Sequence, residues 1–287
     1  MAPIFLVTGA SGFIGGTVAT ALLGRGRVTG LSRTPRAQAG ISTIAHDLAG
    51  PLPPQPQLKG AVVIHCAAEL HAGNWDRHWN SNVIATENLL DWSRRHEVAR
   101  FILFSTGGVY GYHPGRRMRE TDPAAPLDSY GHSKYLAEAV SRSYAQLFGL
   151  QIVIFRLYFP FGTDQGSGVF RLVADALRDG RHLHVKRDGA PRMTPIHVAD
   201  VADAVLHSVA PTFPAGCYNL CGDQDISFLQ LVRGMESRLN LRANLTFTDE
   251  TSGDMMGDNA ALRETGWRPR RPVSDFMRYE PPARVPE

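Results

Sequence analysis

Residues Ile4 to Gly15 read I-F-L-V-T-G-A-S-G-F-I-G, and this stretch sets the architecture of the chain. Its four leading residues form a short apolar run, which is typical of a strand buried on both faces of a sheet. Three glycines follow at intervals of three residues, at Gly9, Gly12 and Gly15. After them, apolar residues recur at helical spacing until Gly24. A buried strand, a glycine-rich turn and an amphipathic helix in this order predict the start of a parallel α/β sheet.

The spacing of the glycines predicts a site for the pyrophosphate of a dinucleotide. The first glycine permits a tight turn, the second lets the backbone approach a ligand closely, and the third lets the helix pack on the sheet. Phosphate oxygens then meet free N–H groups at the helix N-terminus, where the helix dipole favours negative charge. The flanking strand and helix distinguish this motif from a plain structural turn. The residues that we expect to line this site are Gly9, Ser11, Gly12, Phe13, Ile14 and Gly15.

Strands and helices alternate through the first part of the chain. Runs that predict strands occupy residues 4–7, 27–31, 41–45, 61–66, 101–104 and 151–155. Helical spacing of apolar residues covers 12–23, 74–95 and 129–148. This alternation predicts an α/β fold, with a doubly wound parallel sheet covered by helices on both faces. Beyond Arg156 the alternation breaks down, and we expect a helix over 169–177 and then largely irregular structure.

Composition narrows the class of protein. The chain has 287 residues, of which 43% are hydrophobic, and a net charge of +3. No run of lysine and arginine is long enough to bind nucleic acid, so we expect no nucleic-acid partner. No apolar run approaches about 18 residues, and the first residues lack the basic and long apolar regions of a signal peptide, so we expect a cytoplasmic protein that does not contact membranes. The three cysteines, Cys66, Cys217 and Cys221, suit a reducing compartment and lack the second ligand pair of a metal site.

The end of the second predicted strand bears on the choice of dinucleotide. A carboxylate about 20 residues after the glycines holds the adenosine ribose 2′-OH in NAD-binding proteins. This chain instead has Leu31-Ser32-Arg33, with Arg36 nearby and no carboxylate. A guanidinium at Arg33 is suited to a 2′-phosphate, which favours NADP(H). If Arg33 is simply a solvated loop residue, NAD(H) stays open.

Tyr130 and Lys134 stand in Y-G-H-S-K, within a predicted helix. Their spacing of four residues places both side chains on one face. A nearby ammonium lowers the pKa of a phenol from its usual value near 10, which suits Tyr130 to general acid–base catalysis. Ser105 and Thr106 end the preceding strand in F-S-T-G-G-V-Y-G, where a hydroxyl would hold a substrate oxygen beside the cofactor. Together these residues predict hydride transfer at a hydroxyl or carbonyl carbon.

These motifs resemble those of the extended short-chain dehydrogenase/reductase family, which includes UDP-galactose 4-epimerase, nucleotide-sugar 4,6-dehydratases and 4-ketosugar reductases. The resemblance covers nearly the whole chain. It includes T-G-A-S-G-F-I-G, V-I-H-C-A-A, N-V-I-A-T-E-N-L-L, S-T-G-G-V-Y-G, Y-G-H-S-K, F-R-L-Y-F-P-F-G, T-P-I-H-V-A-D-V-A and L-R-E-T-G-W-R-P-R. It implies a Rossmann domain of residues 1–156, to which 192–210 return, and a substrate domain of 157–191 and 211–287. It also implies a dimer formed by the helices around 74–95 and 129–148, whose apolar residues suit an internal core equally well.

The resemblance assigns roles to individual residues. Asp47 and Leu48 match a family position that contacts adenine, Ala67 and Ala68 match the segment that lines the cofactor, and Asn82 matches a structural asparagine. The expected catalytic residues are Tyr130, Lys134 and Thr106. Beyond the glycine turn, the expected cofactor-binding residues are Arg33, Asp47, Leu48, Ala67, Ala68, Ser105, Tyr130, Lys134 and Phe159. Thr106 and Arg192 are expected to bind substrate, with Arg192 directed at a diphosphate, and no metal is expected.

Two departures from the family pattern limit the function. The 4,6-dehydratases carry Asp-Glu directly after the catalytic threonine, whereas this chain has Gly107-Gly108, which argues against dehydration by that mechanism. Phe159 takes the place of a substrate-contacting asparagine. Because of this substitution, a carbonyl substrate that carries no nucleotide remains an alternative to a nucleotide sugar.

The favoured prediction is an NAD(P)-dependent oxidoreductase that acts as a nucleotide-sugar 4-ketoreductase. The first alternative is a nucleotide-sugar 4-epimerase that keeps a tightly bound NAD. The second is a dinucleotide-binding module without activity, against which the retained Tyr130 and Lys134 argue. Glu69 and His71 follow the fourth predicted strand, where loops of doubly wound folds line the reaction centre. Neither of these two residues is assigned a chemical role.

Overall fold

The computed structural model describes residues 2–70, 73–163, 165–250 and 253–278. The chain divides into two compact units. The first unit comprises Met1–Gly111, Pro123–Arg156 and Val201–Tyr218. The second unit comprises Tyr112–Asp122, Leu157–Asp200 and Asn219–Glu287.

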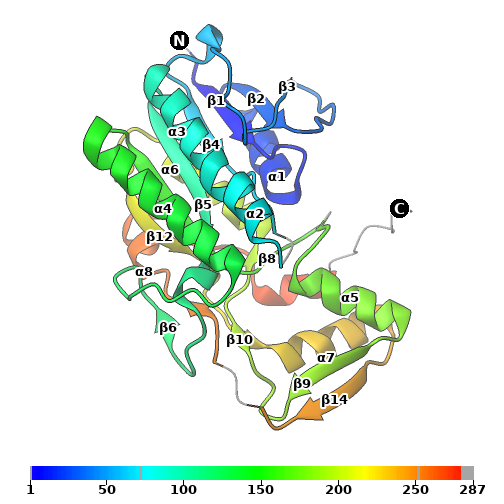
Figure 1. Ribbon diagram of the computed structural model, residues 1–287. Coiled ribbons are helices and arrows are strands. Elements are labelled where there is room, and N and C mark those ends of the chain that lie inside the picture. Colours follow the sequence, from blue (N-terminus) through cyan, green and yellow to red (C-terminus); the bar gives the residue numbers. More distant parts are fainter. Residues whose placement is uncertain (1, 71–72, 164, 251–252, 279–287) are drawn as a thin grey trace. The chain divides into compact units, whose positions relative to one another are not determined.

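A seven-stranded sheet forms the centre of the first unit (Figure 1). Its strands are β1 (Ile4–Thr8), β2 (Arg27–Ser32), β3 (Ile41–Ala45), β4 (Val62–His65), β5 (Arg100–Thr106), β7 (Ile152–Leu157) and β12 (Gly216–Leu220). They lie in the order β12-β7-β5-β4-β1-β2-β3. The neighbours from β3 to β5 are parallel, with Phe5 opposite Val28 on one side and Val62 on the other. The chain thus winds outward from β1 in both directions, which confirms the predicted doubly wound fold.

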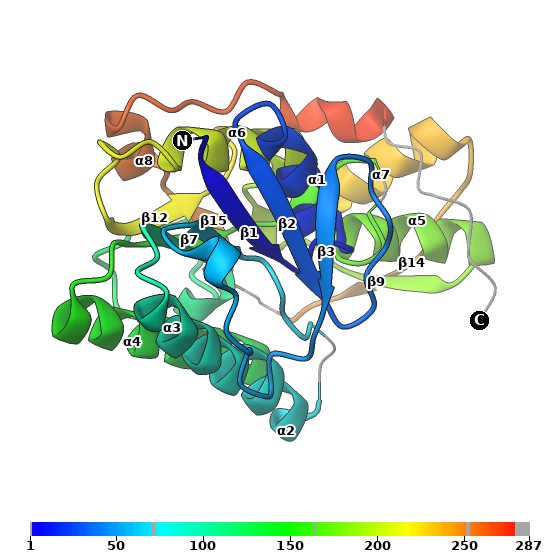
Figure 2. The ribbon, with the colours of Figure 1, turned by 90° about the horizontal axis from the view of Figure 1, so that it is seen from above.

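Helices cover both faces of this sheet (Figure 2). On one face lie α1 (Phe13–Leu22) and α6 (Val198–Ser208), and on the other lie α2 (Trp75–His78), α3 (Ala85–Arg95) and α4 (Ser129–Phe148). The core beneath α3 and α4 joins helix residues such as Leu89 and Leu90 to strand residues such as Leu6, Phe101 and Ile154. Because both faces are covered there, the central strands β1, β4, β5 and β7 are largely apolar rather than alternating, whereas the edge strand β3 is mostly exposed.

The helix predicted over residues 74–95 is interrupted. A π-helical turn, Trp79–Ile84, separates α2 from α3. The expected helix over 129–148 is present with the same bounds as α4, because Asp128 caps its start and Gly149 ends it in the left-handed region at φ 70°. The helix expected over 169–177 is present as α5, Val169–Asp179, and ends in the same way at Gly180.

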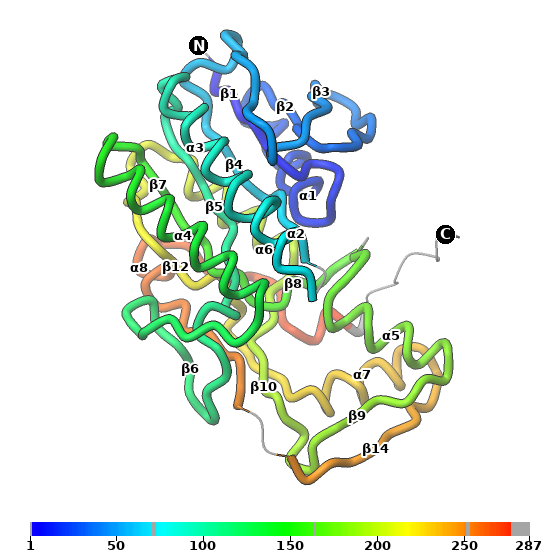
Figure 3. Tube along the Cα trace, in the orientation of Figure 1, coloured from blue at the N-terminus to red at the C-terminus, as the bar shows by residue number. Residues whose placement is uncertain are grey.

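The second unit contains more regular structure than the sequence indicated. Two parallel strands, β9 (His182–Lys186) and β14 (Asn244–Thr248), lie side by side, as Figure 3 shows. Helices α5 and α7 (Phe228–Leu239) share a core that includes Phe161, Phe170 and Leu231. The remaining short elements are β6 (Arg117–Met118), β8 (Pro160–Phe161), β10 (Arg192–Met193), β11 (Ile196–His197), β13 (Ile226–Ser227), β15 (Met256–Gly257), α8 (Ala260–Glu264) and the 3-10 helix Val273–Arg278. In the first unit, 3-10 helices span Pro56–Leu58 and Gly107–Tyr110.

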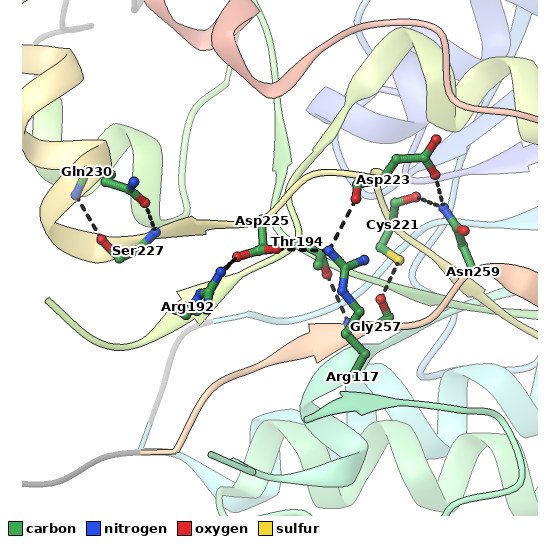
Figure 4. Close-up of polar contacts among 10 residues, drawn as sticks. All are labelled: Arg117, Arg192, Thr194, Cys221, Asp223, Asp225, Ser227, Gln230, Gly257 and Asn259. Carbon is green, nitrogen blue, oxygen red and sulfur yellow. Dashed lines mark hydrogen bonds and ion pairs between the residues drawn. The ribbon is translucent and has the colours of Figure 1, made fainter. Parts of the chain in front are cut away.

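The expectation of irregular structure after the returning segment was therefore wrong for α7. Ser227 and Gln230 form a capping box at its start, in which each side chain accepts a hydrogen bond from the other residue's backbone N–H (Figure 4). The spacing S-x-x-Q before an amphipathic run is a local signal that identifies such a helix from sequence. Strand β12 was also missed, because a five-residue strand at the edge of the sheet carries only a short apolar run.

In the part of the chain that the structure describes, no helix has both the length and the apolar character needed to cross a membrane.

Candidate active site

The glycine-rich turn between β1 and α1 is tightly closed. Gly9 has φ +66°, and a Cβ there would lie 2.9 Å from the backbone of Ala67. The amide of Gly12 donates to the carbonyl of Gly9 at 2.9 Å. A Cβ on Gly15 would lie 2.2 Å from the same carbonyl oxygen. Gly9 and Gly15 are therefore required by the path of the backbone, whereas a Cβ on Gly12 would meet the carbonyl oxygen of Gly9 at 3.2 Å.

The geometry of this turn fits a dinucleotide. Helix α1 begins after Gly12, and among the described residues no side chain caps its first amides. Phe13, Ile14 and Gly15 form the first turn, so their N–H groups lie at the positive end of the helix dipole. The amide of Ser11 donates to Ser32 Oγ at 3.2 Å, which ties the turn to the end of β2. This turn has the free donors and the compact backbone that a pyrophosphate requires.

The residues expected near adenine lie at the ends of β2 and β3. Arg33 is exposed and makes no ion pair with any described residue. Asp47 Oδ1 accepts a hydrogen bond from the amide of Ala49 at 3.0 Å. The side chain of Leu48 is buried in the core, so only its backbone remains available for a ligand.

The end of β4 is held by a buried histidine. His65 Nδ1 lies 2.7 Å from Thr8 Oγ1, and its Nε2 lies 3.1 Å from Thr86 Oγ1. Burial, with a smaller effect of the charge on Lys134, lowers the pKa of His65 to about 3. The imidazole is therefore neutral at physiological pH and links β1, β4 and α3. Ala67 and Ala68 follow it, and the amide of Ala67 donates to Thr8 Oγ1 at 3.2 Å.

Tyr130 and Lys134 lie in the first two turns of α4. Asp128 Oδ1 accepts a hydrogen bond from the amide of Gly131 at 2.6 Å, and this N-cap places Tyr130 at the second position of the helix. Lys134 is 1% exposed. Burial lowers the pKa of Lys134 to about 8, although the charge of Glu138 opposes this shift.

The expected lowering of the Tyr130 pKa does not occur in this structure. Burial raises the pKa of Tyr130, and the negative charge of Asp128 raises it further. The expectation was wrong because it counted the ammonium and neglected the desolvation of a phenolate, which disfavours the charged form.

Ser105 and Thr106, at the end of β5, have different surroundings. Ser105 is buried, and its Oγ donates to Glu138 Oε1 at 2.6 Å. Thr106 is half-buried and begins the 3-10 helix, with Oγ1 accepting a hydrogen bond from the amide of Gly108 at 3.1 Å. The Thr106 hydroxyl proton is left to donate to another oxygen, whereas the Ser105 hydroxyl is already committed to Glu138.

A histidine that the sequence analysis missed contacts the same helix. His78 is fully buried, with Nδ1 3.0 Å from Ser129 Oγ. The centroids of the His78 and Tyr130 rings are 5.9 Å apart in an edge-on arrangement. No local signal marks this residue, because its partners lie 51 and 52 positions further along the chain.

Phe159 and Arg192 belong to the second unit, unlike the other predicted site residues. Phe159 has φ +38°, a left-handed conformation that is unusual for an aromatic residue. Arg192 donates through Nε and Nη2 to Asp225 Oδ2, and Arg117 Nη2 donates to Asp225 Oδ1 at 2.9 Å (Figure 4). Two guanidinium groups thus share one carboxylate, and both remain partly exposed.

A cavity of about 380 Å³ in the second unit contains none of the predicted site residues. Its lining includes three arginines and three acidic residues, so it has no evident preference for an anion. The lining residues are Arg117, Asp223, Asp258, Asn259, Ala260, Arg263, Glu264 and Arg268. Within the described ranges, no group of three or more His, Cys, Asp or Glu side chains is arranged to hold a metal ion.

Glu69, one of the two loop residues without an assigned role, is buried. Its backbone N–H donates to Asn82 Oδ1 at 2.8 Å, and its backbone carbonyl accepts a hydrogen bond from Asn82 Nδ2 at 3.1 Å. His71 lies outside the described residues.

Comparisons with known proteins agree with this arrangement. The model of the NAD dependent epimerase/dehydratase family matches residues 5–221. YtcB of Bacillus subtilis, an uncharacterized UDP-glucose epimerase, is 27% identical over 201 residues, which are 67% of this chain and only 63% of that protein. UDP-glucose 4-epimerase of Mycolicibacterium smegmatis is 27% identical over 294 residues, which cover 92% of this chain and 93% of that protein. The crystal structure of Thermus thermophilus UDP-glucose 4-epimerase in complex with NAD matches the fold with a TM-score of 0.83 over 96% of each chain, at 24% identity.

Proposed function

The chain belongs to the NAD dependent epimerase/dehydratase family, and on that premise we propose that it epimerises a nucleotide sugar at C4. The observation that carries the proposal is the grouping of Tyr130 and Lys134 at the start of α4, with Thr106 ending a strand of the same unit. The sequence favoured a 4-ketoreductase, but the relatives described above are named as epimerases. We therefore prefer what was the first alternative.

In this proposal each residue acts on one oxygen of the sugar. Tyr130 exchanges a proton with the reacting hydroxyl, and Thr106 donates a hydrogen bond to the same oxygen. Because burial raises the pKa of Tyr130, the ammonium of Lys134 one helical turn away is proposed to offset part of this effect when the hydroxyl proton must be accepted. Bound NAD supplies the oxidant and then the reductant for the sugar carbon. Gly107 and Gly108 provide no carboxylate for elimination of water, which is why we do not propose a dehydratase.

The cofactor would be held by the first unit. The amides of the α1 N-terminus would bind the pyrophosphate, and Ala67 and Ala68 would line its path. Arg192 is proposed to bind the diphosphate of the substrate, which requires exchange of its contact with Asp225. Phe159 is proposed to limit which sugars are accepted, since it presents a ring where the family has an amide.

A second candidate is a ketoreductase that uses NADP(H). The observation that favours it is Arg33, which is exposed at the end of β2 and has no partner among the described residues. A free guanidinium at this position suits a 2′-phosphate. A ketoreductase exchanges its cofactor in every turnover, whereas an epimerase retains it.

We further propose a homodimer that forms through α3 and α4. Tyr135 near the start of α4, and Leu147 and Phe148 at its end, have exposed fractions of 38%, 72% and 51%. Large exposed apolar side chains on one helix are typical of an interface. Light scattering of the purified protein tests this proposal, and a monomer at micromolar concentration would contradict it.

One experiment separates the two candidate activities. The protein is purified without added cofactor, denatured, and the released dinucleotide is identified by mass spectrometry. In parallel, UDP-glucose and UDP-galactose are each incubated with the protein, and the anomeric protons are followed by NMR. Retained NAD and interconversion without added cofactor support the epimerase. If the purified protein releases no dinucleotide and oxidises one NADPH for each 4-ketosugar that it reduces, it is instead a ketoreductase.

A further inference from the structure

A buried ion pair in the first unit joins α4 to β7. The side chains of Glu138 and Arg156 are 0% and 4% exposed. Arg156 Nε donates to Glu138 Oε1 at 3.0 Å, and Arg156 Nη2 donates to Oε2 at 2.7 Å. Two parallel hydrogen bonds of this kind fix the orientation of both side chains as well as their separation.

Further donors complete the pair. Ser105 Oγ donates to Glu138 Oε1, and Arg142 Nη2 donates to Oε2, both at 2.6 Å. Arg156 Nη1 donates to the Tyr110 hydroxyl at 2.6 Å, and the guanidinium lies 4.6 Å from the centre of the Tyr110 ring. Burial opposes ionisation of Glu138, but hydrogen bonds from Arg156 and Ser105, with the charge of Arg156, hold its pKa below the usual value. The carboxylate is thus charged and fully hydrogen-bonded inside the protein.

Three members of this cluster, Ser105, Tyr110 and Glu138, lie within four residues of a predicted reacting group in the chain. Ser105 directly precedes Thr106 at the end of β5, and Tyr110 closes the 3-10 helix that Thr106 begins. Glu138 stands one helical turn after Lys134 on α4. The cluster therefore connects the strand end that carries Thr106 to the helix that carries Lys134.

Stability alone does not account for a cluster of this kind. Replacing a buried ion pair with apolar residues of similar size is often neutral or stabilising, because the cost of removing two charges from water is relieved. Removing one partner has the opposite effect, since it leaves an isolated buried charge. A cluster that spans three elements at this point is better explained by the geometry that it imposes.

We propose that Glu138 is a positioning residue, which holds the strand end that carries Thr106 and the turn of α4 that carries Lys134 in fixed relative positions through Ser105 and Arg156. The proposal rests on the proposed function in treating Thr106 and Lys134 as reacting groups. Glu138 itself reaches neither substrate nor cofactor in this scheme, because both of its oxygens are occupied by protein donors.

The negative charge of Glu138 also affects the pKa of Lys134. The titratable groups near Lys134 include His65 at the end of β4, Cys66 directly after it, and Tyr130 and Glu138 one helical turn before and after it on α4. Of these, His65 is neutral, and burial also keeps Cys66 and Tyr130 uncharged by raising their pKa values. Glu138 is the charged neighbour that raises the pKa of Lys134 against burial. Removing its charge must therefore lower the pKa of Lys134.

The composition of the chain makes this pKa measurable. The sequence contains only three lysines, Lys59, Lys134 and Lys186. With ¹³Cε-labelled lysine, the protein gives three signals, which Lys59→Arg and Lys186→Arg variants assign. Titration of the protein without substrate then follows Lys134 directly.

Glu138→Gln is the main variant, because it keeps the shape and removes the charge. We expect the Lys134 midpoint to fall by about one pH unit and kcat to fall at least about tenfold. Ser105→Ala leaves the charge in place and removes only the link to β5, so kcat falls while the Lys134 midpoint stays. Ser141→Ala is the matched control, since this equally buried hydroxyl of α4 donates to Ala137 within the helix, and neither quantity should change.

A double variant separates positioning from stability. Glu138→Gln with Arg156→Met removes both charges and should recover thermal stability relative to Glu138→Gln alone, while kcat stays low. Recovery of wild-type kcat together with stability would overturn the proposal, as would an unshifted Lys134 midpoint in Glu138→Gln. If the wild-type protein acts on no nucleotide sugar, the proposed function fails, yet the lysine titration still decides whether Glu138 controls Lys134.

Discussion

The side-chain amide of Asn82 donates to the hydroxyl of Ser133 at 2.9 Å, and Ser133 Oγ in turn donates to the carbonyl of Tyr130 at 2.8 Å. Asn82 also exchanges two hydrogen bonds with the backbone of Glu69, at 2.8 and 3.1 Å. It lies in the π-helical turn, and such turns are frequent at functional sites. A fully buried amide thus links the loop after β4 to the turn of α4 that carries Tyr130.

Asn82→Ala should destabilise the protein by about 1–3 kcal/mol, because the backbone of Glu69 and the hydroxyl of Ser133 lose buried partners. Urea unfolding followed by circular dichroism measures this change. Asn80→Ala is the control, since Asn80 lies in the same turn but is exposed and should change stability by less than about 0.5 kcal/mol. Equal effects of the two substitutions would contradict the linking role of Asn82.

Tyr130→Phe should lower kcat by about 10²–10⁴-fold, since it removes the proton that the mechanism transfers. Cofactor affinity, measured by quenching of protein fluorescence, should stay within about twofold because the ring is retained. Tyr135→Phe tests the same chemical change on a more exposed side of α4 and should leave kcat unchanged. Substantial turnover by Tyr130→Phe would rule out this tyrosine as the acid–base group.

Arg33→Ala should weaken NADPH binding about tenfold or more and NADH binding much less. A charge-assisted contact to the 2′-phosphate contributes about 1.5–3 kcal/mol, and only NADPH carries that group. Calorimetric titration of both cofactors provides the comparison, with Arg36→Ala as a neighbouring exposed arginine. An equal loss of affinity for NADPH and NADH would show that Arg33 does not contact the 2′-phosphate.

Gly15→Ala should prevent closure of the turn, because the new Cβ would lie 2.2 Å from the carbonyl oxygen of Gly9 and backbone atoms must shift. We expect a loss of about 1–3 kcal/mol in stability and of dinucleotide binding. Gly24→Ala has no atom within 4 Å of its Cβ and serves as control. Normal cofactor binding by Gly15→Ala would contradict the close approach of helix and strand.

Stability should rise between pH 8 and pH 10.5 because of Lys134. Its pKa is about 8 in the folded protein and near 10.5 when unfolded, so the unfolded chain binds more protons in this interval. The rise attributable to this residue is about 3 kcal/mol. Lys134→Met should flatten it, whereas Lys59→Met, at an exposed position, should not. Urea unfolding at several pH values measures the slope, and an identical slope in wild type and Lys134→Met would refute the assignment.

Features that depend on residues close together in the chain could be predicted from the sequence. The glycine turn follows from the spacing of Gly9, Gly12 and Gly15, two of which leave no room for a Cβ, and the shared face of Tyr130 and Lys134 follows from helical spacing. Alternation of strands and helices predicted the doubly wound sheet apart from its edge strand β12, because parallel strands buried on both faces have a distinctive apolar pattern. Even α7, which was missed, has a local signal in Ser227 and Gln230.

Other features depend on residues that are distant in the chain. Ser105, Glu138 and Arg156 meet from positions 18 and 33 apart, and His78 meets Ser129 across 51. Spacing along the chain carries no information about such pairs. Burial is likewise a property of the assembled fold, which is why the direction of the Tyr130 pKa could not be foreseen from its neighbour Lys134. Local sequence specified the turn, the helix and the order of reacting groups, and folding set their charge states, because desolvation arises only when distant segments close around a side chain.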